Sequence, residues 1–184
     1  MKKTVIKNSV HEILRQLPID ITSESVRETP ARVAEMYDEL LEGYTQDPKK
    51  IFKTFEIGSY DGLIVVSDIQ FYSLCEHHMI PFFGKVHIGY IPEQRILGLS
   101  KFARLVNVFS RRLQVQERLT EQLAESIMRY LQPQGVIVSI EAEHLCMSMR
   151  GVNKPGSTTK TLITKGVCSE DERYVKNFFA QVKR

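Results

Sequence analysis

Two clusters of metal-binding side chains, far apart in the chain, place the strongest constraint on how this sequence can fold. The clusters are Ser73-Leu74-Cys75-Glu76-His77-His78 and Glu143-His144-Leu145-Cys146. Cys75 and His78 are three positions apart, a spacing at which one turn or hairpin presents two ligands to a single ion. If both clusters lie on strands of one sheet, or at strand ends, Cys75, His78 and Cys146 can converge. The sequence therefore predicts a sheet that brings the two clusters together.

The residue types in these clusters favour zinc, which prefers a tetrahedral mixture of sulfur and nitrogen ligands. Three protein ligands would leave a fourth position open for water, as in catalytic zinc sites. A structural site, in which His77 or His144 fills the fourth position, is the first alternative. Simple packing is the second, because short motifs match by chance and buried cysteines usually only pack.

Size and composition set further limits on the class of protein. A chain of 184 residues with 42% hydrophobic residues fits one domain with a substantial core, preceded by a helical extension. No apolar run approaches the ~20 residues of a membrane span, and the N-terminus lacks the apolar region of a secretory signal. The three cysteines form no disulfide framework, which predicts a reducing, cytoplasmic setting. A net charge of +3 is too small to indicate nucleic-acid binding, so neither nucleic acid nor membrane is expected as a partner.

The distribution of charge says more than its sum. Between positions 95 and 118 the chain has a single acidic residue, Glu117, and a group of bases: Arg95, Lys101, Arg104, Arg111, Arg112 and Arg118. Lys101 and Arg104 follow Ser100, which we expect to cap a helix whose N-terminus attracts anions. This stretch predicts an anionic ligand. A nucleic-acid module using these bases is an alternative, but the interleaved aromatic residues of such modules are missing.

Hydrophobic periodicity predicts an α+β fold. We expect helices at about 4–17, 29–41, 100–109 and 115–131, a last helix that begins after Ser169 and runs to about 182, and strands at about 63–74, 82–91, 136–149 and 158–165. Ser169 and Glu172 predict a capping box for the last helix. The strands would form a mainly antiparallel four-stranded sheet with helices on one face, with an N-terminal helical region (1–56) and a catalytic domain (57–184). Such a small sheet has open edges, which predicts oligomerisation.

Several motifs occur together in an order that resembles one family. They are Thr29-Pro30-Ala31-Arg32-Val33-Ala34, Cys75-Glu76-His77-His78, Gly98-Leu99-Ser100-Lys101 with Arg104, Gln114-Val115-Gln116-Glu117-Arg118-Leu119-Thr120, and Glu143-His144 with Cys146 and Met149-Arg150-Gly151. From about Thr29 to the C-terminus, the chain resembles GTP cyclohydrolase I.

This resemblance implies conversion of GTP and water into 7,8-dihydroneopterin triphosphate and formate, the entry to folate or tetrahydrobiopterin synthesis. It implies the tunnelling fold, in which subunits pair their sheets into a barrel, commonly as a homodecamer with active sites between subunits. It also implies one zinc ion per subunit. The family's zinc ligands correspond to Cys75, His78 and Cys146, and its proton-transfer histidines correspond to His77 and His144.

The resemblance also assigns residues to the substrate. Gln116 and Glu117 correspond to residues that hold the guanine, and Ser100 to a residue near the ribose and phosphates. The bases that bind the triphosphate correspond to Arg32, Lys101, Arg104 and Arg150. Glu117 can accept from the guanine N1–H and amino group together, a donor pair that adenine lacks. The alternative for Glu117 is a favourable interaction with the helix dipole, and Arg32 on spacing alone is a solvated charge.

Two other enzyme classes are compatible with parts of this pattern. Nitrile reductases of the tunnelling-fold group resemble the chain in fold but use a catalytic cysteine without zinc, so metal analysis separates them. A zinc nucleoside deaminase is disfavoured because its CxxC signature is missing.

Overall fold

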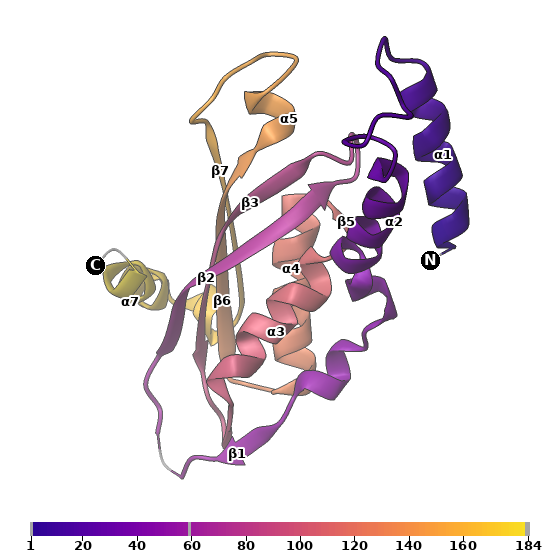
Figure 1. Ribbon diagram of the computed structural model, residues 1–184. Coiled ribbons are helices and arrows are strands. Elements are labelled where there is room, and N and C mark those ends of the chain that lie inside the picture. Colours follow the sequence, from indigo (N-terminus) through magenta and orange to yellow (C-terminus); the bar gives the residue numbers. More distant parts are fainter. Residues whose placement is uncertain (1, 59, 183–184) are drawn as a thin grey trace. The chain divides into compact units, whose positions relative to one another are not determined.

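A computed structural model describes residues 2–58 and 60–182 of the chain (Figure 1). The chain divides into two compact units between Glu42 and Gly43. The helices are α1 (Lys3–Arg15), α2 (Thr29–Leu40), α3 (Leu99–Ser110), α4 (Gln116–Tyr130), α5 (Leu145–Ser148), α6 (Val167–Glu170) and α7 (Glu172–Val182), with short 3-10 turns at Glu42–Thr45 and Pro48–Ile51. The strands are β1 (Thr54–Glu56), β2 (Ile64–Cys75), β3 (Pro81–Ile91), β4 (Arg95–Leu97), β5 (Leu113–Gln114), β6 (Gly135–His144) and β7 (Thr158–Gly166).

The N-terminal unit is a pair of helices, α1 and α2. Pro30 occupies the first turn of α2, where its missing N–H costs no helical hydrogen bond. The Lys3 ammonium lies 2.5 Å from a Glu35 carboxylate oxygen and 3.3 Å from one of Asp38, and both pairs join α1 to α2. Because these groups are exposed, the pairs add little stability. The domain boundary expected near residue 57 stays a prediction about domain organisation.

The second unit is built on a five-stranded sheet in the order β5-β2-β3-β6-β7. Strands β2, β3, β6 and β7 pair antiparallel, so the predicted four-stranded sheet is confirmed. The two-residue strand β5 extends it by pairing parallel to the end of β2, and β1 and β4 form a separate two-stranded sheet. The α+β class expected of the tunnelling fold is therefore confirmed. The sequence did not predict β5 or the β1–β4 sheet, because these strands are too short to show hydrophobic periodicity.

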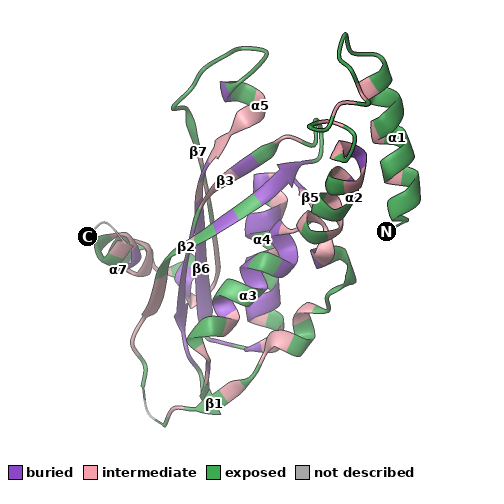
Figure 2. Ribbon diagram, in the orientation of Figure 1, coloured by how far each residue is buried: buried purple, intermediate pink, exposed green. Residues whose placement is uncertain are grey.

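Alternate residues of the central strands face two different layers. Val136, Val138 and Ile140 of β6 belong to the main core under α3 and α4, whereas Ile137 packs with Phe178 of α7. Figure 2 shows the buried positions concentrated on the strands and on the facing sides of α3 and α4. The expectation of helices on one face therefore needs one correction, because α7 packs on the opposite face.

Two helix starts also differ from expectation. Gly98, not Ser100, is the N-cap of α3, and Ser100 lies exposed in the first turn. The expected capping box of Ser169 is not formed, because its hydroxyl donates to the Gly166 carbonyl (2.7 Å) and 167–170 is a separate short helix. Asp171 instead accepts from the Arg173 backbone N–H (2.9 Å) at the start of α7. Aspartate satisfies such an orphan donor as well as serine does.

Strand β6 ends at His144, five residues before the end expected from its pattern. Its last pair with β3 joins Phe82 and His144, and its last pair with β7 joins Glu143 and Thr158. The chain then turns into α5, so Cys146 lies on a helix rather than on a strand. Within the described part of the chain, no helix combines the length and apolar character that crossing a bilayer requires.

Candidate metal centre and nucleotide site

The turn between β2 and β3 places His78 beside Cys75. The Cys75 N–H donates to the Ile80 carbonyl (2.9 Å), and the Cys75 carbonyl accepts from the Met79 N–H (2.8 Å). Met79 adopts a positive φ of 54°, which reverses the chain within this short connection. The two side chains therefore extend from one tight turn toward the same space.

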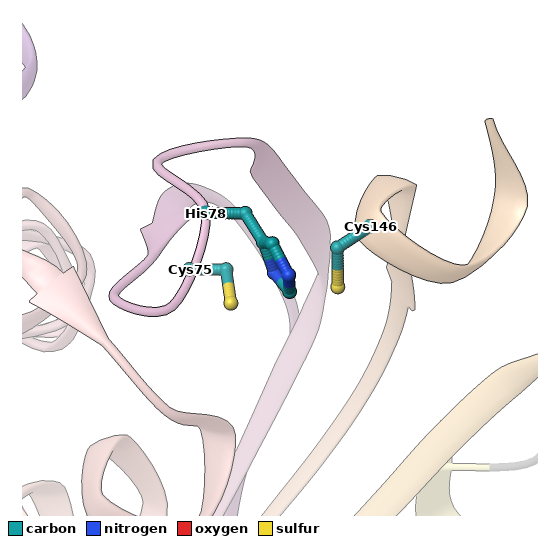
Figure 3. Close-up of side chains that lie close together, drawn as sticks. All are labelled: Cys75, His78 and Cys146. Atoms are coloured by element: carbon teal, nitrogen blue, oxygen red, sulfur yellow. The ribbon is translucent and has the colours of Figure 1, made fainter. Parts of the chain in front are cut away.

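The end of β6 supplies the third member of the group. Because His144 pairs with Phe82 at the start of β3, the helix α5 that follows lies beside the turn. The Sγ of Cys75, one ring nitrogen of His78 and the Sγ of Cys146 all lie within 4.8 Å of one another (Figure 3). Two sulfurs and an imidazole nitrogen are a donor set that suits a borderline-soft divalent metal. The predicted convergence of the two clusters is confirmed, and the group can hold a metal ion.

The electrostatics of this group favour a cation between the sulfurs. Burial raises the pKa of the Cys146 thiol, and the neighbouring Cys75 sulfur raises it further. Two thiolates at this separation repel each other unless a positive charge lies close to both. Metal binding removes that repulsion and keeps both sulfurs deprotonated.

Two further histidines are close to these residues in the sequence but do not belong to the group. His77 is exposed, and its Nδ1 lies 3.7 Å from the Cys75 sulfur. His144 is half-buried, and its Nε2 lies 2.9 Å from the Gln116 side-chain oxygen. Desolvation lowers the pKa of His144, against the opposing effect of the Glu117 carboxylate. These contacts favour the three-ligand arrangement over one in which His144 closes the coordination sphere.

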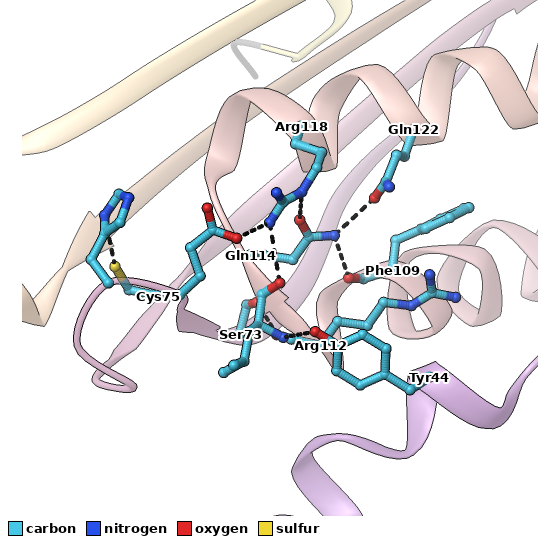
Figure 4. A network of polar contacts seen from close by, with 11 residues as sticks. Tyr44, Ser73, Cys75, Phe109, Arg112, Gln114, Arg118 and Gln122 are labelled. Atoms are coloured by element: carbon cyan, nitrogen blue, oxygen red, sulfur yellow. Dashed lines mark hydrogen bonds and ion pairs between the residues drawn. The ribbon is translucent and has the colours of Figure 1, made fainter.

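A polar network that the sequence did not reveal ties the turn to α4 (Figure 4). The Arg118 guanidinium forms an ion pair with Glu76, which lies between the two candidate ligands of the turn, and this contact lowers the pKa of Glu76. Arg118 also donates from Nε to the Gln114 side-chain oxygen (3.0 Å) and from Nη2 to the Leu113 carbonyl (3.3 Å). The Glu76 N–H donates to the Gln114 carbonyl (3.0 Å). The network therefore fixes the turn relative to the first turn of α4.

The residues expected to bind guanine lie at the start of α4 with different exposure. Glu117 is exposed, whereas Gln116 is buried and its side-chain polar atoms already have partners in the protein. The Glu117 carboxylate lies close enough to His144 to affect the pKa of that imidazole. A purine base bound by Glu117 would therefore be close to His144.

The cations expected to bind the triphosphate occupy two places in this unit. Lys101 and Arg104 line a surface cavity of about 420 Å³, whose other lining residues are Thr45, Gln46, Asp47, Lys50, Ile51, Lys53 and Val108. Desolvation lowers the pKa of Lys101, as do the neighbouring charges of Arg104 and Lys53. Arg150 lies at the metal group, where its guanidinium is 3.0 Å from Nε2 of His78. Both places concentrate positive charge and suit an anionic ligand.

Arg32, the remaining cation expected to bind the triphosphate, belongs to the N-terminal unit and not to the unit that contains the other three. It is exposed on α2 in the N-terminal unit, and its role in phosphate binding stays a prediction. The sequence predicted the three residues of the metal group found in the described part of the chain, but it did not predict the supporting residues Glu76, Gln114 and Arg118. They stood inside the quoted motifs, yet nothing in their spacing indicated which side chains they contact.

The sequence is similar to known proteins along nearly its whole length. A sequence profile described as GTP cyclohydrolase I matches residues 6–183. The GTP cyclohydrolase 1 of Wolinella succinogenes is 46% identical over 183 residues, which cover 99% of this chain and 98% of the relative. That of Clostridium perfringens strain 13 is 49% identical over 181 residues, with 98% and 97% covered. That of Brucella anthropi is 52% identical over 149 residues, with 80% and 70% covered.

Proposed function

The chain belongs to the GTP cyclohydrolase I family, and from that premise we propose how its own residues convert GTP and water into 7,8-dihydroneopterin triphosphate and formate. The single observation that carries the proposal is the convergence of two sulfurs and one imidazole nitrogen, with His77 beside Cys75 and His144 two residues before Cys146. This arrangement offers a metal and proton-transfer groups in one place, as hydrolysis of the purine ring requires.

We infer that the metal is zinc, one ion per subunit, held by Cys75, His78 and Cys146. Sulfur and imidazole ligands favour zinc, and three of them leave one coordination position for a non-protein ligand. A zinc ion held by these residues would lower the pKa of a bound water and so supply a nucleophile for the purine ring at neutral pH. His77 contacts Cys75 and His144 lies two residues before Cys146, and we assign to these two histidines the proton transfers that accompany opening of the imidazole ring.

The substrate is proposed to lie with its guanine at Glu117 and its triphosphate among the cations. The exposed Glu117 carboxylate accepts from N1–H and the amino group of guanine. Lys101, Arg104 and Arg150 neutralise the phosphates, with Ser100 near the ribose and phosphates and Arg32 adding a further base. In this arrangement Glu117 recognises the guanine base, and a separate set of cations neutralises the charge of the triphosphate.

Assembly and location are part of the same proposal. In the described part of this single chain, β7 forms one outer edge of the sheet and pairs only with β6. An edge of nine residues is long enough to pair with another subunit. We propose a homodecamer in the cytoplasm whose sites lie between subunits, with GTP as the ligand and no nucleic-acid or membrane partner. The catalytic domain is proposed to span 57–184.

The proposed function is tested directly by incubating the zinc-loaded protein with GTP. We expect formate and a pterin in equal amounts, with the pterin detected by fluorescence after oxidation and the formate by an enzymatic assay. ATP in place of GTP should give neither product, because adenine offers no donor pair to Glu117. Absence of formate from the zinc-loaded, assembled protein would contradict the proposal.

The network around Arg118 leads to a separate prediction about metal affinity. In Arg118→Gln, the ion pair with Glu76 is lost, and the turn that carries Cys75 and His78 becomes less restrained. Outer-shell changes of this kind weaken metal affinity by roughly 10-fold or more. Competition with a chromophoric zinc chelator measures the change. Arg129→Gln, an exposed arginine later on the same helix, is the matched control; equal zinc affinity in the two variants would show that the network does not support the ligands.

A further inference from the structure

Gln116 is a buried polar residue at the start of α4 whose side-chain amide is surrounded by acceptors. Only 1% of the residue is exposed. Its Nε2 lies within hydrogen-bond distance of three acceptors, the Ile140 carbonyl (3.2 Å), the Thr159 carbonyl (3.1 Å) and Oγ1 of Thr161 (3.1 Å), which share the two hydrogens of the amide. Backbone carbonyls only accept hydrogen bonds, so the NH₂ group of the amide must face β6 and β7. The orientation of the amide is therefore determined by its surroundings.

That orientation directs the side-chain oxygen of Gln116 at His144. The Oε1 atom lies 2.9 Å from Nε2 of His144 and, as an amide oxygen, can only accept. Nε2 of His144 must therefore carry the proton of this hydrogen bond. In the neutral imidazole this leaves Nδ1 as the nitrogen with the available lone pair.

Two hydroxyl groups hold the amide in a closed ring of hydrogen bonds. The Thr120 hydroxyl donates to the Gln116 backbone carbonyl (2.7 Å), so its oxygen accepts in the 2.7 Å contact with the Thr161 hydroxyl. The Thr161 hydroxyl therefore donates to Thr120 and accepts from the Gln116 amide. Each hydroxyl donates once and accepts once, and a fully satisfied buried ring of this kind resists rearrangement.

The ring plane of His144 is fixed from another direction. Phe82 stacks on it with ring centroids 4.7 Å apart and planes inclined by 3°. Stacking restrains rotation of the imidazole about its Cβ–Cγ bond but still allows a 180° flip, which keeps the same ring plane. The hydrogen bond from Nε2 to Gln116 removes that remaining freedom.

We propose that Gln116 is a positioning residue for His144, which anchors the Nε2–H of the imidazole and presents Nδ1 as the nitrogen that exchanges a proton with the substrate. The inference rests on the proposed function, because it assigns His144 to proton transfer. It gives the Gln116 side chain a task other than guanine binding, since all its polar atoms already have partners in the protein. Guanine recognition then falls to the exposed Glu117 carboxylate.

The variant Gln116→Met tests this assignment, because methionine has a similar length and offers Nε2–H only a weak sulfur acceptor. General acid–base catalysis contributes roughly 100- to 10,000-fold, so we expect a misdirected imidazole to lower kcat by about 10- to 100-fold. The KM for GTP should stay within about threefold, because a lost interaction of the transition state alone lowers kcat without weakening substrate binding. Zinc content should match the wild type. An unchanged kcat, or a rise in KM at least as large as any fall in kcat, would overturn the proposal.

A second pair of variants covers the case in which Gln116→Met does not fold. Thr161→Val removes the hydroxyl that accepts from the Gln116 amide, while Thr164→Val changes a threonine of the same strand that pairs with Ile137. We expect kcat to fall about threefold or more in Thr161→Val and to stay unchanged in Thr164→Val. Equal kcat in the two variants would count against the proposal. Wild-type protein that produces no formate would instead overturn the proposed function, so the two failures are distinguishable.

Discussion

Cys146→Ala is expected to empty the zinc site and to lower kcat by at least roughly 1000-fold, because the activated water is then lost together with the metal. Cys75 and His78 extend from one turn, and a two-ligand site does not hold zinc against dilution. Zinc content of the purified, reduced protein, measured by mass spectrometry of the metal, should fall from one ion per chain to a small fraction. Formate production from GTP reports the activity.

Two further variants separate loss of metal from loss of chemistry. His144→Ala should keep zinc and lose turnover by roughly 100- to 10,000-fold, because His144 contacts Gln116 rather than belonging to the metal group. Cys168→Ala removes the third cysteine, a buried thiol on α6 whose pKa burial raises to about 11, and should keep both zinc and activity. Zinc retained in Cys146→Ala, or lost in His144→Ala, would show that the ligands are assigned wrongly.

The meeting of the two metal-binding clusters could be predicted because strand periodicity and ligand spacing indicated the same sheet. The end of β6 could not be predicted in the same way. A strand continues only while a neighbour offers hydrogen bonds, and β3 begins beside His144. The pattern of alternating residues carried on to 149, but beyond His144 the described part of the chain offers no strand to pair with, and α5 forms instead. Ser148 then donates to a Glu143 carboxylate oxygen (2.7 Å) across the bend.

The hydrophobic pattern of the sequence also did not predict on which face of the sheet α7 packs. Its apolar stripe predicted a buried face but did not identify the partner. Gly89 in β3 supplies the reason, because a Cβ at this position would lie 2.7 Å from the Phe178 ring. The absence of a side chain there makes room for the helix on the second face. A glycine within a strand was the available signal of this close approach.

The supporting contacts of the site depend on tertiary structure alone. Gln116 and His144, like Glu76 and Arg118, are distant in the sequence and meet only after the sheet and α4 have formed. Motif similarity assigned the Gln116 side chain to guanine. Its burial and its four partners favour a role in placing the imidazole.

Glu117→Gln is expected to raise the KM for GTP by roughly 100-fold, with a smaller effect on kcat. The carboxylate accepts two hydrogen bonds from guanine in the proposed complex, and the amide can accept only one while its NH₂ faces a second donor. Loss of a hydrogen bond to a charged group costs about 1.5 to 3 kcal/mol, and each 1.4 kcal/mol is tenfold in affinity. Inosine triphosphate, which lacks the amino group, should lose less affinity than GTP on the same change.

Helix-dipole stabilisation makes a different prediction for the same variant. A carboxylate in the first turn of α4 would contribute about 0.3 to 1 kcal/mol to stability, so its loss would lower the melting temperature slightly and leave the KM unchanged. Glu121→Gln, an exposed glutamate one turn later on the same helix, controls for general effects of charge removal. Equal KM values for the two variants would return Glu117 to a role in helix stability. A large rise confined to Glu117→Gln would place the guanine at the N-terminus of α4, beside the imidazole of His144.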